Sequence, residues 1–179
     1  MWSFKHLMHL RSFALLGLIA IGSASCGFHL RGAGLDSTQS FYVEGIAYSD
    51  PFVADLTQVT STAGGQITSS LANAAAIIHI HKIWYLRRGM SLSQFGQTTM
   101  YELSYRVAYD IREKSGEILI PQRDLQVVRQ YYNSQTMPLA QAQEEGVIVQ
   151  EMHMEAAQSL LRQTINAVER SKLKQPQKQ

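Results

Sequence analysis

Two histidines separated by one residue are the side chains whose types and spacing could do chemistry. His79 and His81 flank Ile80, and in an extended strand this spacing points both imidazoles to the same face. Two imidazoles on one face can chelate a transition-metal ion. No third ligand stands nearby in the sequence, although folding could bring His153 to the pair. A periplasmic metal-binding or hydrolytic protein is therefore one hypothesis, and partly exposed strand histidines without a ligand are the simpler interpretation.

Sequence motifs for catalysis are absent. The chain contains no G-x-S-x-G, C-x-x-C or H-E-x-x-H motif and no glycine-rich phosphate-binding loop. Glutamates near the C-terminus could act as general acids or bases, but their spacing is typical of the solvated side of a helix: Glu144, Glu145, Glu151 and Glu155. We therefore predict a protein that is not an enzyme, with no catalytic residues, no metal ligands and no dissociable cofactor.

One basic group lies inside the central part of the chain, at Lys82, Arg87 and Arg88, where an expected strand enters a polar loop. Arginine can hold a phosphate group through two hydrogen bonds, so these residues are candidates for binding an anionic ligand; a solvated hairpin end is the alternative. Between residues 26 and 169 ten basic residues stand against fourteen acidic ones. A nucleic-acid-binding domain shows the opposite balance, and we expect no nucleic-acid partner.

The first 25 residues have the layout of a secretory signal peptide. Lys5 and Arg11 precede an apolar run of nine residues, and small residues lead up to Cys26. The run is too short to cross a bilayer, which needs about 20 apolar residues. A signal peptide that ends at a cysteine resembles the lipobox of bacterial lipoproteins, in which the thiol is acylated. We expect a covalent lipid on Cys26, the only cysteine of the chain, and Gly27 after it favours the outer membrane.

Alternating hydrophobicity predicts the strands. The clearest is 101–111, where apolar residues occupy every second position. Residues 76–86 carry apolar side chains on both faces, which indicates a central strand or a bulge. Pro121 is expected to limit the ladder beyond 118–120, and the remaining predictions are a strand at 41–43, a strand at 125–132, a polar loop at 89–96 and a turn at 114–117.

Two helices complete the prediction. Asp50 before Pro51 is a helix start, Gly64 with Gly65 ends that helix, and an apolar stripe predicts a second, long helix from Leu139. Both helices can cover one face of the sheet. We predict an α+β two-layer sandwich, with two helices packed on one face of a small, mostly antiparallel sheet of about four strands. The expected divisions are a lipoprotein signal peptide (1–25), the folded domain (26–169) and a basic, disordered tail (170–179).

Several short motifs, in order, resemble one protein family. They are Cys26-Gly27-Phe28-His29-Leu30-Arg31, Gly96-Gln97-Thr98, the segment 119–124, the segment 129–133, the segment 137–140, and the helical residues around 151–162. Together they are similar to the lipopolysaccharide (LPS)-assembly lipoproteins, LptE, also called rare lipoprotein B.

The resemblance implies a function. Members of that family are anchored in the inner leaflet of the outer membrane of Gram-negative bacteria, facing the periplasm. They plug the LptD β-barrel, are needed for its assembly, and are thought to bind LPS for delivery to the cell surface. A generic outer-membrane lipoprotein that binds another envelope component, such as peptidoglycan, is the alternative.

The resemblance also assigns roles to individual residues. Relatives can carry basic residues before the Gly-Gln motif and after the Met-x-Leu-Ala motif, where this chain has Gln94-Phe95 and Gln141. We therefore expect LPS contacts at Arg87, Arg88 and Lys82 instead. Phe28, Leu30 and Arg31 are expected to form an ordered lead-in that contacts the bilayer or the barrel.

Overall fold

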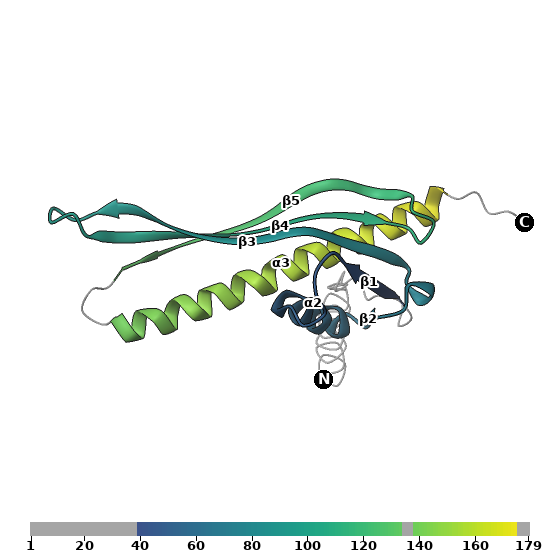
Figure 1. The fold of residues 1–179 in the computed structure, drawn as a ribbon, viewed down its shortest axis with the longest axis horizontal. Helices are drawn as coiled ribbons and strands as arrows, with labels where there is room; N and C mark the ends of the chain where they lie inside the picture. The colour runs from purple at the N-terminus through teal and green to yellow at the C-terminus, as the bar shows by residue number, and fades with distance from the viewer. Residues whose placement is uncertain (1–38, 134–137, 175–179) are drawn as a thin grey trace, which may run out of the picture. The chain divides into compact units, whose positions relative to one another are not determined.

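The computed structural model describes residues 39–133 and 138–174. Within these ranges the chain forms a five-stranded sheet, two α-helices and a short 3-10 turn, Leu71–Asn73. The strands are β1 (Ser40–Glu44), β2 (Gln66–Thr68), β3 (Ala76–Leu92), β4 (Thr98–Arg112) and β5 (Ile118–Tyr132), and the helices are α2 (Pro51–Thr62) and α3 (Pro138–Lys174). Both helices lie on the same side of the sheet (Figure 1). The predicted two-layer α+β fold is therefore confirmed.

The sheet is mixed and has the order β2-β1-β3-β4-β5. β1 pairs in parallel with β2 and with β3, whereas the long ladders from β3 to β4 and from β4 to β5 are antiparallel. The prediction of about four strands was one short, because β2 has only three residues and cannot show a period of two. A parallel pair needs a crossover connection, and α2 supplies it between β1 and β2.

One face of β4 forms the core with α3. The odd-numbered residues of this strand from Leu103 to Ile111 are at most 3% exposed. They pack against α3 residues that have no exposed surface, namely Met152, Ala156, Ala157 and Leu160. Full burial of one large apolar side chain stabilises a fold by about 1.5–3 kcal/mol. The alternating pattern of β4 therefore decides which side of the sheet the helices cover.

The ends of α2 follow local chemistry. The Asp50 carboxylate accepts a hydrogen bond from the backbone N–H of Phe52 at 2.9 Å, and Pro51 is the first helical residue. Beyond the last turn Gly64 has φ +91°, a left-handed conformation that glycine adopts without strain. The predicted helix start and stop are both confirmed.

A bulge in β3 explains why its apolar residues occur on both faces. Ile80 pairs with Tyr109 and Lys82 pairs with Ala108, so His81 has no partner on β4. Because of this extra residue, the side chains that face the helices change from even-numbered to odd-numbered positions of β3. Ile80 faces the helices before the bulge, and the odd-numbered residues face them after it. β3 is therefore both central and bulged, as its sequence indicated.

Two strands are longer than predicted. β3 continues to Leu92, so part of the expected loop at 89–96 is strand, and the hairpin tip contains Gly96 at φ +75°. β5 runs unbroken through Pro121. β5 is an edge strand of the sheet, where proline is tolerated because its missing N–H can face the side without a neighbouring strand. The pairing of β5 with β4 is irregular on either side of Ile111. The expected break at this proline was wrong.

Helix α3 extends to Lys174, so the first part of the predicted disordered tail is helical. Two lysines in its last turn, Lys172 and Lys174, favour this because cations stabilise a helix C-terminus. Residues 175–179 lie outside the described ranges, as do Cys26 and the lead-in at 28–31. Among the described helices, none combines the length and apolar character needed to span a bilayer.

Candidate functional site

The long strands β3, β4 and β5 have one face that no described helix covers. The register of the two ladders defines this open face. Beyond the bulge it carries Lys82, Trp84, Leu86 and Arg88 from β3, the even-numbered residues of β4 from Glu102 to Asp110, and Asp124, Gln126, Val128 and Gln130 from β5. Charged and amide groups dominate it, so the open face suits a polar partner.

Paired charges and hydrogen bonds hold the open face together. Arg88 and Glu102 form an ion pair at 2.9 Å, and the ammonium of Lys82 lies 5.4 Å from the centre of the Trp84 ring. The amide of Gln130 donates to the carboxylate of Glu102 at 3.3 Å. Arg88 is 59% exposed at its side chain, so it remains accessible to a second anion.

The predicted basic group is divided between the two faces of the sheet. Arg88 and Lys82 lie on the open face, whereas Arg87 points to the helix side, because consecutive strand residues alternate. Arg87 Nε lies 3.1 Å from a carboxylate oxygen of Glu145 in α3. Its guanidinium also stacks 3.7 Å from the centre of the Tyr101 ring. The structure therefore joins Arg87 to the core-facing side and separates it from the other two.

Glu145 accepts hydrogen bonds from two tyrosines of the sheet and forms an ion pair with Arg87. Tyr85 donates to it at 3.1 Å, Tyr131 donates to its other oxygen, and Arg87 donates to the Tyr131 hydroxyl at 3.0 Å. Burial, followed by the hydrogen bond to Glu145, raises the pKa of both tyrosines. The prediction that Glu145 lies on a solvated helix side was wrong, since this carboxylate attaches the first turns of α3 to the sheet.

The histidine pair meets a carboxylate that the sequence analysis missed. Asp110 Oδ2 lies 3.1 Å from His79 Nδ1 and 2.6 Å from His81 Nε2. Arg112 donates from Nε to Asp110 Oδ1 at 2.6 Å and from Nη2 to His79 Nδ1 at 2.9 Å. Burial alone would raise the pKa of Asp110, but hydrogen bonds from Arg112 and His81 hold that pKa below its ordinary value.

His153 does not join this cluster. Its ring lies 4.3 Å from that of Tyr105 on the helix side of the sheet, and its Nδ1 is 3.5 Å from Asp55 Oδ2. Only the ladder register brings Asp110 opposite His79. The available signal was the alternation of 101–111, which already placed Asp110 on the polar face.

The β3–β4 hairpin, the end of β5 and the start of α3 lie at one end of the sheet (Figure 1), and large apolar side chains in these segments are exposed. Leu92, Phe95, Tyr132 and Leu139 are 67%, 79%, 80% and 76% exposed. Isolated exposed apolar residues are ordinary, but several at one end of a domain are typical of a contact surface. The sequence analysis did not single them out.

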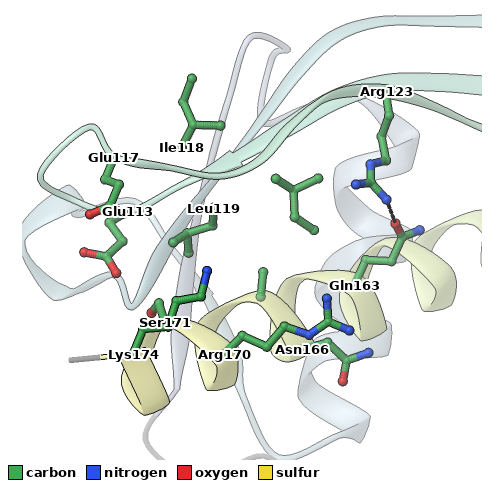
Figure 2. Close-up of a pocket in the computed structure, with 12 residues that line it drawn as sticks. Glu113, Glu117, Ile118, Leu119, Arg123, Gln163, Asn166, Arg170, Ser171 and Lys174 are labelled. Atoms are coloured by element: carbon green, nitrogen blue, oxygen red, sulfur yellow. Dashed lines mark hydrogen bonds between the residues drawn. The ribbon is translucent and has the colours of Figure 1, made fainter. Parts of the chain in front are cut away.

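A pocket of about 520 Å³ lies at the β4–β5 turn and the last turns of α3. Figure 2 shows Glu113 and Glu117 on the turn, and Arg170 and Lys174 on the helix. Arg123 lines it from β5 and donates to Gln163 at 3.5 Å. Three basic side chains and two acidic ones line the pocket, so it carries both signs of charge with a small positive excess.

Solved structures define the class of this fold. The chain is 28% identical to lipoprotein B from Nitrosomonas europaea, with a TM-score of 0.64 over 76% of this chain and 89% of that one. It also resembles the rare lipoprotein B from Shewanella oneidensis (16% identity, TM-score 0.65, 75% and 99% covered). A minor lipoprotein from Acinetobacter baumannii has the same fold, with 19% sequence identity, a TM-score of 0.58, and 74% of this chain and 93% of that one covered. A search of curated proteins found no match.

The family follows from the sequence. The model of the LptE lipopolysaccharide-assembly family matches residues 38–164, which includes the whole sheet, α2 and most of α3. The chain therefore belongs to the LptE family, and the predicted resemblance is confirmed. Membership of an assembly family is consistent with a protein that is not an enzyme.

Proposed function

We propose that this chain is an outer-membrane lipoprotein that works in LPS transport and assembly, where it plugs the LptD β-barrel, aids the assembly of that barrel, and binds LPS. Family membership over residues 38–164 supports the LPS-assembly role. The uncovered polar face of β3, β4 and β5 carries the structural part of the proposal. The lumen of a membrane β-barrel is polar, so a plug needs a polar surface of this kind.

The membrane anchor is Cys26 with its covalent lipid. Fourteen positions separate Cys26 from Ser40, where β1 begins. A fully extended chain of that length spans at most about 50 Å, so the lipid keeps the folded domain close to the inner leaflet. Phe28, Leu30 and Arg31 lie within this reach and remain our candidates for contact with the bilayer or the barrel.

The two basic residues of the open face are the revised candidates for LPS. Lys82 and Arg88 are six residues apart on β3, which is about 20 Å in a strand. At this separation they cannot both bind one phosphate group, but they can contact two separate anionic groups of one large ligand. Arg87 keeps a different role, since its guanidinium is engaged with α3. Arg88→Ala should weaken binding of LPS micelles, whereas Arg87→Ala should mainly loosen α3.

The experiment is a pull-down of the tagged full-length protein from detergent-solubilised outer membranes. The proposal expects a large β-barrel protein to copurify. Arg106→Glu changes a charge at the middle of the open face and should reduce barrel recovery. Arg162→Glu makes the same change on the exposed side of α3 and is the matched control.

Three results would contradict the proposal. A lipoprotein recovered free of any barrel would remove the plug function. Copurification of a different envelope component would favour the generic lipoprotein alternative. Equal barrel recovery for Arg106→Glu and Arg162→Glu would remove the open face from the contact while leaving the family role intact.

A further inference from the structure

We propose that His79, His81 and Asp110 form a binding site for a divalent transition-metal ion, with zinc as the probe. One donor atom from each of the three side chains lies within 4.8 Å of the others. The two imidazoles come from β3 and the carboxylate comes from β4. This inference is independent of barrel binding and of LPS binding.

The β3 bulge creates the convergence. His79 is the direct partner of Asp110 across the ladder, whereas His81 is the extra residue without a partner. A bulge commonly re-aims a side chain, and here the His81 ring approaches the same carboxylate oxygen that His79 approaches. The two imidazole rings lie 4.2 Å apart between centres. Two histidines that were merely solvated would not both be expected to contact the same oxygen atom, Asp110 Oδ2.

The backbone just after β1 supports this geometry. Gly45 has φ +90°, and a Cβ at this position would lie 2.1 Å from the carbonyl oxygen of Ile80 and 3.0 Å from Cδ2 of His79. Only glycine lets the end of β1 come this close. The chain therefore holds the His79 ring between Gly45 and Asp110.

The donor set selects the class of ion. Two imidazole nitrogens with one carboxylate oxygen suit Zn²⁺ or Cu²⁺, whereas Mg²⁺ and Ca²⁺ prefer oxygen ligands alone. Three protein ligands leave a fourth position of a tetrahedral zinc for water or another molecule. The His79 and His81 side chains are 23% and 28% exposed, so an ion can reach them from the open face.

Arg112 competes with the metal. Its guanidinium is always protonated, so its contact at 2.9 Å makes His79 Nδ1 the unprotonated nitrogen that a metal requires. Arg112 thus stands where the ion would bind. It has a second acid nearby, since Nη1 is 3.7 Å from Glu44 Oε1. Metal binding would move Arg112 toward Glu44, and removing this arginine should tighten the site.

The test is calorimetric titration of the full-length protein in detergent, purified without a histidine tag, with ZnCl₂ and with MgCl₂. We expect one zinc per chain and no magnesium. His81→Ala should weaken zinc binding about tenfold or more, because loss of even an indirect partner costs 10–100-fold. Arg112→Gln should tighten it. His153→Ala, which removes a histidine from the helix side, is the matched control and should leave it unchanged.

Circular dichroism of each variant shows whether the fold is retained, and Co²⁺ absorbance reports tetrahedral coordination in any variant that folds. Absence of stoichiometric zinc uptake by the wild type would overturn the proposal. Equal zinc affinity of wild type and His81→Ala would place the ion elsewhere and overturn it as well. Uptake seen only in Arg112→Gln would show that the native cluster is an ion-pair network.

Discussion

Replacing Arg87 tests whether this arginine attaches α3 to the sheet or serves the open face. The structure assigns it three interactions on the helix side. These are the ion pair with Glu145 at 3.1 Å, the hydrogen bond to Tyr131 at 3.0 Å, and the stacking over Tyr101 at 3.7 Å. Most side chains in the first turns of α3 are exposed. Only the contact with Glu145 reaches α3 directly, and the contacts with Tyr131 and Tyr101 hold the Arg87 guanidinium in place for it.

The expected cost follows from these contacts. A partly exposed ion pair contributes up to about 1 kcal/mol, a net hydrogen bond about 1 kcal/mol, and a cation–π contact at a partly exposed site about 0.5–1 kcal/mol. Because the three share one guanidinium they are not additive. We expect Arg87→Ala to lower the free energy of unfolding by about 2 kcal/mol, which for a domain of this size lowers Tm by roughly 4–8 °C.

Two measurements check this prediction. Urea denaturation gives the change in unfolding free energy, and hydrogen exchange should show faster amide exchange in 139–148 than in the core of α3. Arg88→Ala is the matched control, because the Arg88 side chain is 59% exposed and its ion pair with Glu102 should contribute less than about 1 kcal/mol. A double-mutant cycle of Arg87→Ala with Glu145→Gln should show a coupling energy of about 1 kcal/mol.

Equal destabilisation by Arg87→Ala and Arg88→Ala would refute the assignment of the two residues to different faces. Unchanged exchange in 139–148 would show that the tyrosine hydrogen bonds to Glu145 and the apolar contacts of α3 hold its first turns without Arg87. A large loss of LPS affinity in Arg87→Ala, with Arg88→Ala unaffected, would return Arg87 to the ligand site.

Two further predictions concern the ends of the sheet and the histidine cluster. Gly45→Ala should cost about 3 kcal/mol or more, because the new Cβ would lie 2.1 Å from the Ile80 carbonyl oxygen. Gly116 has nearly the same φ, +89°, but open space around a Cβ. Gly116→Ala should therefore cost only about 1–2 kcal/mol. Equal urea midpoints for the two variants would refute the steric argument. The pKa of Asp110 is lower in the folded protein than its ordinary value of 3.8. Its ionised carboxylate therefore stabilises the fold at any pH above 3.8, and this stabilisation is lost as the pH falls through the folded pKa. With EDTA present, Asp110→Asn should therefore lower the free energy of unfolding at pH 7 and have a stability close to that of the wild type near about pH 2. A difference in unfolding free energy that does not change with pH would refute this.

Local features of the sequence determined much of the fold. Asp50, Pro51 and Gly64 set the ends of α2 through their own side chains and backbone preferences. The alternation of 101–111 determined which face of β4 is buried, because burial of large apolar side chains dominates the energy. The motifs spread from Cys26 to the C-terminal helix led to the LptE family, which the match over 38–164 confirmed.

Only the tertiary structure decided which side chains meet. Asp110 joins His79 and His81 because of the strand register and a one-residue bulge, and a bulge depends on the neighbouring strand as much as on the sequence. Arg87 and Arg88, adjacent in sequence, are separated because a strand alternates its faces, and the face each one takes follows from the bulge upstream. Composition and spacing determined the type of fold, while register and packing against α3 decided the surfaces from which a function can be argued.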